Sequence, residues 1–197
     1  HVNKTSLRKT PLCYRPRETP GKVANQKKSA TLDLVWQIGA SMSISLQTQI
    51  PAFAEQPATS GKAVSSDSLT GVFTVLYFYP KDNTSGCTTE SRDFSGLHDE
   101  FVARNCQIFG VSRDSVKSHE NFKARYDMPF ELISDPDETL CSLFDVMKMK
   151  NMYGKQVRGI ERSTFLIDSN GTLIAEWRKV KVPGHADEVL ATLKGLS

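Results

Sequence analysis

One short segment of the chain carries the residue types that nucleophilic thiol chemistry requires. Between Pro80 and Glu90 the sequence leaves an apolar run and enters a helical pattern, and Cys87 falls in the first turn of that helix. Unpaired backbone N–H groups and the positive end of the helix dipole at such a position favour a thiolate. Gly86 allows close approach of the backbone, and the hydroxyl of Thr84 suits a small polar substrate. The segment therefore predicts a reactive cysteine at position 87 rather than a buried structural one.

Alternating strands and helices must position this junction. The β-branched and aromatic runs predict strands at residues 72–79, 107–111, 132–133, 163–168 and 172–177. Helical spacing predicts helices at 87–105 and at about 185–196. Capping residues predict two more: one from Asp114 or Ser115 to about Tyr126, and one capped by Asp135 with Pro136 as its first residue. Ser169-Asn170-Gly171 between the last two strands indicates a hairpin. This order predicts an α/β fold, a three-layer α/β/α sandwich with a mixed sheet, in which Cys87 follows the first strand.

The same junction resembles a known active-site motif. The pattern Pro80-x-x-x-Thr84-x-x-Cys87 matches the motif of peroxiredoxins, and residues 77–90 as a whole resemble the peroxiredoxin Q / bacterioferritin comigratory protein subfamily. The resemblance begins near residues 50–53, which are similar to the opening Pro-x-Phe of the family. It continues through residues 159–168 to the C-terminus and covers about 150 residues.

This resemblance implies a thiol peroxidase on a thioredoxin-like fold, without a metal or other cofactor. Cys87 would be the peroxidatic cysteine, Arg162 would support its thiolate, Pro80 would shield the thiolate from water and Thr84 would orient the peroxide. A guanidinium beside the sulfur favours the thiolate and stabilises charge on the departing oxygen. The implied substrates are hydrogen peroxide and organic hydroperoxides, which leave a cysteine sulfenic acid. The implied reductant is thioredoxin, glutaredoxin or glutathione.

The recycling step departs from the pattern of the subfamily. Many members carry a resolving cysteine five residues after the peroxidatic one, where this chain has Arg92, and Ser85 replaces the usual proline. Cys106, at the start of a predicted strand, and Cys141, on a predicted short helix, are expected to be core residues. Two routes remain open: a one-cysteine cycle with an external thiol, which we favour, and Cys141 as a distant resolving partner. A thioredoxin-like redox sensor or chaperone that has lost turnover is the alternative function.

Composition excludes several other classes of protein. The 197 residues are 39% hydrophobic and 24% charged, as in globular domains. The longest apolar-leaning stretch, residues 32–46, is shorter and more polar than the roughly 20 apolar residues that span a membrane. The net charge of +3 divides into +6 over residues 1–47 and −3 over the rest, so the body has no basic surface for nucleic acid. The sequence contains no Cys-x-x-Cys pair, which argues against zinc ribbons and disulfide oxidoreductases.

The basic N-terminal segment predicts a targeting role. Residues 1–49 are expected to form a presequence or disordered extension, and residues 50–197 the thioredoxin-like peroxiredoxin domain. The segment resembles a plastid transit peptide, and residues 52–54 resemble a cleavage site that would lead to the chloroplast, including the thylakoid lumen. A bacterial periplasm or cytoplasm is the alternative location. We expect a monomer or weak dimer.

The remaining polar residues are expected to be structural. A basic, solvated loop is predicted around Lys148, Lys150, Lys155 and Arg158. Three histidines without a common ligand spacing are expected at the surface, namely His98, His119 and His185. Glu90 is expected either to join the hydrogen-bond network of the active site or simply to favour the helix N-terminus.

Overall fold

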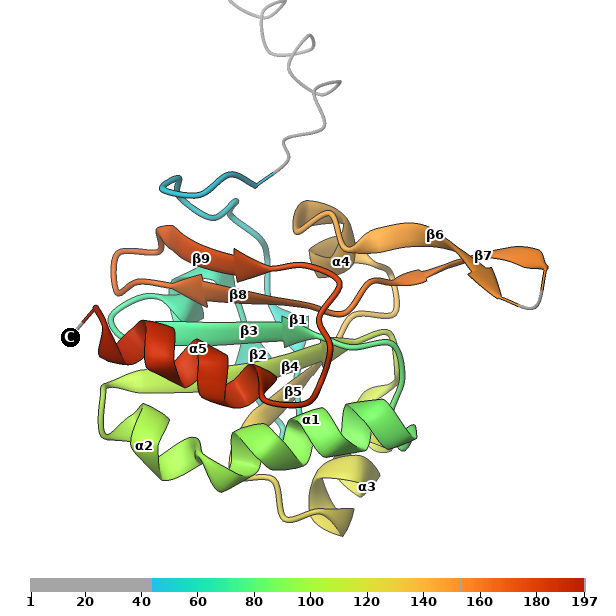
Figure 1. The fold of residues 1–197 in the computed structure, drawn as a ribbon, viewed down its shortest axis with the longest axis horizontal. Coiled ribbons are helices and arrows are strands. Elements are labelled where there is room, and N and C mark those ends of the chain that lie inside the picture. The colour runs from blue at the N-terminus through green and yellow to red at the C-terminus, as the bar shows by residue number, and fades with distance from the viewer. Residues whose placement is uncertain (1–43, 153, 197) are drawn as a thin grey trace, which may run out of the picture. The chain divides into compact units, whose positions relative to one another are not determined.

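A five-stranded mixed sheet forms the centre of the computed structural model, which describes residues 44–152 and 154–196 (Figure 1). Its strands are β3 (Phe73–Phe78), β4 (Cys106–Ser112), β5 (Glu131–Ser134), β8 (Ser163–Ile167) and β9 (Leu173–Trp177). Their spatial order is β5-β4-β3-β8-β9, in which β3, β4 and β5 are mutually parallel and β8 is antiparallel to both β3 and β9. The helices are α1 (Ser85–Gly96), α2 (His98–Val102), α3 (Val116–Arg125), α4 (Thr139–Leu143) and α5 (His185–Lys194). Shorter elements outside the sheet are β1 (Gln56–Pro57), β2 (Ala63–Val64), the 3-10 helix η1 (Ser66–Leu69), β6 (Met147–Met152) and β7 (Lys155–Ile160).

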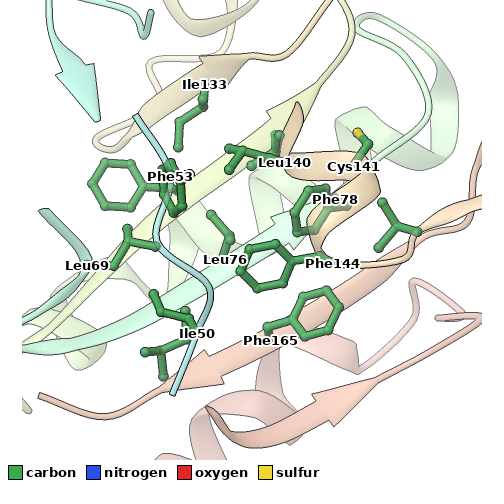
Figure 2. Close-up of a cluster of buried hydrophobic side chains, with 14 of the residues drawn as sticks. Ile50, Phe53, Leu69, Leu76, Phe78, Ile133, Leu140, Cys141, Phe144 and Phe165 are labelled. Carbon is green, nitrogen blue, oxygen red and sulfur yellow. The ribbon is translucent and has the colours of Figure 1, made fainter. Parts of the chain in front are cut away.

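Side chains from both faces of the central strand β3 are buried, because successive residues of a strand point to opposite faces. Leu76 and Phe78 contribute to one hydrophobic cluster, which includes side chains of α4 and of the segment before η1 (Figure 2). Val75 and Tyr77 contribute to a second cluster, with side chains of α1, α2, α3 and α5. Helices α1, α2 and α5 lie together over one face of the sheet in Figure 1. The layered α/β architecture and the mixed sheet predicted from the sequence are confirmed.

The helix predicted over residues 87–105 is two helices. Helix α1 ends at Gly96, and α2 starts at His98 after Leu97, whose backbone N–H bonds back to the carbonyl of Asp93. Glycine is a poor helix former, and acidic residues at the start of α2 favour a new N-terminus there. Helix α3 matches the prediction, since the Ser115 hydroxyl caps it by accepting a hydrogen bond from the backbone N–H of Ser118.

The helix predicted to begin at Pro136 begins at Thr139 instead. Residues 135–138 form a turn, closed by a hydrogen bond from the N–H of Glu138 to the carbonyl of Asp135. The Asp135 carboxylate nevertheless acts on this helix, because it accepts from the backbone N–H groups of Leu140 and Cys141 at 3.2 and 2.8 Å. The N-cap residue of α4 is Glu138, so the predicted cap position and the predicted helix start were both wrong, although the Asp135 carboxylate binds the first turn from three residues further back.

The predicted basic loop is a β-hairpin. Strands β6 and β7 pair antiparallel from Met147 with Ile160 to Met152 with Lys155, and Gly154 adopts φ 77° at the turn. The Met-Lys alternation of residues 147–150 has the two-residue period of a strand, although its lysines by themselves suggest only a solvated charge cluster. Figure 1 shows this hairpin extending away from the central sheet.

Residues 44–49, which the sequence pattern assigns to the N-terminal extension, pack on this unit. The N–H of Gln47 donates to the carbonyl of Leu173, and the N–H of Leu173 donates to Thr48. Ile44 and Phe53 are buried in the same cluster as Phe78 and Phe165. Cleavage at residues 52–54 would therefore remove buried side chains. The expectations for residues 1–43, including the presequence, lie outside the described residues.

No helix among the described residues is both long and apolar enough to cross a membrane.

The packing of the N-terminal segment predicts a loss of stability when one of its side chains is truncated. Phe53 is 8% exposed, so Phe53→Ala should lower the free energy of unfolding by about 3 kcal/mol through lost burial and a residual cavity. Leu46, which is 50% exposed, provides the control, and Leu46→Ala should change that free energy by less than about 0.5 kcal/mol. Urea denaturation of both variants measures the difference. Equal effects would show that Phe53 does not pack as described.

Candidate active site

The candidate nucleophile lies at the start of α1, directly after the loop that follows β3. Cys87 is the third residue of this helix and is fully buried, whereas Thr84 and Ser85 just before it are exposed. Its sulfur therefore lies just beneath the surface. The first-turn position predicted from the sequence is the observed one, and the N-terminal end of a helix favours a thiolate there.

Arg162 reaches the sulfur from the neighbouring strand. Ser163, the first residue of β8, pairs with Phe78, the last residue of β3, so Arg162 lies beside the start of the loop that leads to Cys87. Its Nη2 donates to the Cys87 Sγ at 3.3 Å, and its Nη1 pairs with the carboxylate of Glu90. The backbone of Gly86 lies against this guanidinium, since a Cβ there would lie 3.4 Å from Nη2, an ordinary van der Waals distance. The structure thus brings together two residues that are 75 positions apart in the sequence.

Burial shapes the ionisation of Glu90 and Arg162. Burial raises the pKa of Glu90 to about 7, although the neighbouring Arg162 opposes the shift. Burial alone would lower the pKa of Arg162, but Glu90 and Cys87 outweigh it, and the pKa lies above its ordinary value. Glu90 Oε1 is buried and has no hydrogen-bond partner among the described residues. Glu90 therefore joins the site through Arg162, one of the two roles expected for it.

Thr84 and Pro80 frame the entrance of the helix. Thr84 is the residue before α1, its carbonyl accepts from the N–H of Thr88, and its Oγ1 donates to the carbonyl of Lys81 at 3.0 Å. That hydroxyl is exposed and retains its acceptor capacity. Pro80 is exposed, two residues after the end of β3. Their roles toward a peroxide and toward water remain predictions.

The other two described cysteines are buried and free, as the sequence analysis favoured. Cys141 belongs to the cluster that contains Phe78, which Figure 2 shows, and Cys87 belongs to the cluster that contains Tyr77. The two cysteines therefore lie on opposite faces of the sheet. Burial and the adjacent Asp135 raise the pKa of the Cys141 thiol. Burial raises the pKa of Cys106 to about 12. Both thiols are protonated at neutral pH and are poor nucleophiles.

Lys150 lies close to the site, which the sequence analysis missed. It belongs to β6 and is half-buried, and its Nζ donates to the carbonyl of Ile160 at 2.5 Å. Burial lowers its pKa, and Cys87 and Arg162 act on it electrostatically. The strand-like alternation of Met and Lys in residues 147–150 was the sequence signal that could have placed Lys150 on a strand with its side chain toward the site.

Two histidines that were expected at the surface are buried. His119 is fully buried, and His185 is 3% exposed with its Nε2 at 2.7 Å from the hydroxyl of Thr164. Burial lowers the pKa of His185 to about 4, so its ring is neutral at pH 7. Among the described residues, no group of three His, Cys, Asp or Glu side chains is arranged to hold a metal ion.

The chain is similar to proteins of one family. A model described as the AhpC/TSA family matches residues 46–176. Peroxiredoxin Bcp of Xanthomonas campestris pv. campestris is 62% identical over 124 residues, which are 63% of this chain and 78% of that protein. Peroxiredoxin Bcp of Bacillus subtilis is 50% identical over 137 residues, which are 70% of this chain and 87% of that protein.

Solved structures agree with these matches. A structure of the Xanthomonas campestris bacterioferritin comigratory protein, studied for its alkyl peroxide reduction activity, is 54% identical with a TM-score of 0.70 and covers 73% of this chain and 91% of its own. Two further structures of that organism's peroxiredoxin Q carry serine at one or another of two different cysteines. The resemblance predicted from the junction motif and its thioredoxin-like fold are thereby confirmed. The chain belongs to the AhpC/TSA family, and within it to the peroxiredoxin Q/Bcp group of thiol peroxidases.

Proposed function

We propose that Cys87 is the nucleophile of this thiol peroxidase and that it reduces hydrogen peroxide and alkyl hydroperoxides. In the reaction the thiolate sulfur attacks one peroxide oxygen, and the O–O bond breaks. The second oxygen leaves as hydroxide or alkoxide and takes up a proton. Cys87 is oxidised to the sulfenic acid, and the peroxide is reduced to water or an alcohol. The observation that carries the proposal is the contact of 3.3 Å between the Arg162 guanidinium and the Cys87 sulfur.

Arg162 is suited to act at both ends of that step. Before attack its positive charge favours the thiolate over the thiol. During attack, charge moves from the sulfur to the departing oxygen, and a fixed guanidinium stabilises it without reorganising. The ion pair with Glu90 and the bond from the N–H of Val180 to the Arg162 carbonyl support this fixed position.

The location of the sulfur favours small substrates. Cys87 is fully buried, but Thr84 and Ser85 on the preceding turn are exposed, so a peroxide has only a short way to travel. In our proposal the exposed hydroxyl of Thr84 accepts a hydrogen bond from the peroxide O–H, and Pro80 keeps bulk water away. The alkyl peroxide reduction described for the Xanthomonas campestris relative supports the inclusion of organic hydroperoxides.

For recycling we favour a one-cysteine cycle in which thioredoxin, glutaredoxin or glutathione attacks the sulfenic acid. The external sulfur displaces the hydroxyl group as water and forms a mixed disulfide, which a second thiol then reduces. The usual resolving position holds the exposed Arg92.

Cys141 is the competing resolving residue. A disulfide requires its Cα to come within about 7 Å of that of Cys87, and the two belong to opposite faces of the sheet. Helix α4 would have to unwind, which would break the two hydrogen bonds from its backbone to Asp135 and expose Leu140. The high pKa of the Cys141 thiol also opposes this route.

The compartment is a separate question. The composition of residues 1–47 supports a plastid presequence, whereas the relatives reported above are bacterial proteins. The relatives favour the bacterial alternative and lend no support to the chloroplast.

Replacement of the nucleophile should abolish the reaction. Cys87→Ser should reduce the rate constant for hydrogen peroxide by roughly a thousandfold or more, because a serine hydroxyl is not ionised at neutral pH. Cys106→Ala and Cys141→Ala are the matched controls and should react with peroxide within about threefold of the wild type. Stopped-flow measurement with the reduced proteins tests this. Near-normal reaction of Cys87→Ser would refute the assignment.

Arg162 should be needed for the oxidation step. Arg162→Ala should slow peroxide reduction by about 100-fold, and Arg162→Lys should restore only part of that loss, because a lysine cannot contact Cys87 and Glu90 with a planar fork. Arg158→Ala is the control, since Arg158 is exposed and pairs with Glu138 away from the sulfur. A rate for Arg162→Ala equal to that for Arg158→Ala would remove Arg162 from the mechanism.

The products of one turnover should distinguish the recycling routes. After one equivalent of peroxide, non-reducing peptide mass spectrometry should find Cys87 as sulfenic acid, trapped by dimedone, and then as a mixed disulfide when glutathione is added. The Cys141→Ala variant should give the same products. A dominant Cys87–Cys141 disulfide would establish a two-cysteine cycle instead.

A further inference from the structure

The loop that carries Pro80 and Thr84 has one buried side chain. Asp82 is 5% exposed, whereas Pro80, Lys81, Asn83 and Thr84 on either side of it are exposed. A carboxylate is seldom buried unless it is paired, so the partners of Asp82 must compensate for its burial. The peroxidase chemistry proposed above does not use it.

The Asp82 carboxylate is held from two other elements. The hydroxyl of Tyr79, the residue directly after β3, donates to Oδ1 at 2.8 Å, and the hydroxyl of Ser118 in α3 donates to Oδ2 at 2.7 Å. The ring Nδ1 of His119, also in α3, lies 2.9 Å from Oδ2. The backbone N–H of Asp82 donates to Asp114 Oδ2 at 2.9 Å. Burial alone would raise the pKa of Asp82, but these partners outweigh it and lower the pKa, so the carboxyl is ionised.

His119 faces an acceptor on each side of its ring. Nδ1 meets the Asp82 carboxylate, and Nε2 lies 3.2 Å from the carbonyl oxygen of Ile133 in β5. A neutral imidazole has one N–H and one lone pair, so in that form one nitrogen would oppose an oxygen without a proton between them. The imidazolium donates at both positions and satisfies both oxygens. His119 is fully buried, which makes an unsatisfied arrangement costly.

We propose that Asp82 and His119 form a buried ion pair that positions the Pro80–Thr84 loop, and with it Thr84 and the first turn of α1, for peroxide reduction. The proposal rests on the function proposed above for Cys87. Both are positioning residues: among the contacts of the described residues, none joins either side chain to the Cys87 sulfur. The pair anchors the loop to α3 and β5. In the described structure, no exposed residue of the loop makes a side-chain hydrogen bond to either of these elements. A displacement of a reacting group by about 1 Å slows an enzyme by roughly 100-fold, so an anchor at this place affects the rate without touching substrate.

Neutralising one member or both tests the ion pair. Asp82→Asn leaves a buried cation without its counter-charge, and His119→Gln leaves a buried carboxylate without its cation. Each single variant should oxidise Cys87 roughly 10- to 100-fold more slowly in stopped-flow assays with hydrogen peroxide. The double variant Asp82→Asn/His119→Gln contains no unpaired charge and should react faster than either single variant. If the double variant is as slow as the product of the two single effects, the ion pair does not exist and the proposal fails.

A second ion pair of α3 provides the matched control. Lys123 of α3 pairs with Glu131 of β5 at 2.6 Å, on the same two elements but away from the loop. Glu131→Gln should lower the melting temperature and leave the rate of Cys87 oxidation within about twofold of the wild type. A comparable loss of rate in Glu131→Gln would show that general destabilisation, and not loop position, slows the single variants.

A measurement on the unaltered protein covers the case in which the variants fail to fold. In the NMR spectrum of protein labelled with ¹⁵N at histidine, His119 should show two ring N–H groups at neutral pH. Their absence from the spectrum of His119→Gln assigns these signals to His119. If that variant is unfolded, the contact of the ring with Ile133 assigns them instead. A single ring N–H would overturn the proposal. Failure of the wild type to consume peroxide would refute the function proposed for Cys87, and the ring signals would still decide the ion pair.

Discussion

The arginine that pairs with both the thiol and a buried carboxylate is the interaction around which the site is organised. Arg162 contacts Cys87 with one nitrogen and Glu90 with another, and three ionisable groups are thereby removed from water together. Such burial is favourable only when the charges compensate one another. The folded protein holds the Glu90 proton more tightly than the unfolded chain between pH 4.5 and about 7, so this group lowers stability as pH rises through that range. The site therefore sacrifices stability for a fixed guanidinium.

One face of the central strand β3, together with its pairing to β8, holds this arrangement in place. Tyr77 bonds through its hydroxyl to Ser91 of α1 at 2.9 Å, and Tyr79, which stacks on it, bonds to the loop before that helix. Gly110 on β4 permits the Tyr77 ring to lie where it does, because a Cβ there would approach the ring to 2.7 Å. The same strand fixes Arg162 through its pairing with β8. One buried strand thus supports the loop, the helix and the arginine at once.

The sequence predicts the parts of the site that depend on local pattern. Cys87 in a first helical turn, Thr84 before it and the mixed sheet all follow from neighbouring residues or from the motif. The contact of Asp82 with His119 joins residues 37 positions apart, and the approach of Lys150 depends on a hairpin whose register no local rule fixes. The late start of α4 has a different, local cause, since a turn at residues 135–138 overrides the propensity of Pro136 for a first helical position.

The central proposal is that the Arg162 guanidinium, in contact with the Cys87 sulfur, prepares it to attack a peroxide as a thiolate. The most direct test is the ultraviolet thiolate absorbance of the reduced protein at neutral pH, compared among wild type, Cys87→Ser and Arg162→Ala. The account predicts a signal of about one thiolate per chain in the wild type, its loss in Cys87→Ser and a clear decrease in Arg162→Ala, since Cys106 and Cys141 are protonated there. An absorbance in Arg162→Ala equal to that of the wild type, or none in the wild type, would contradict it.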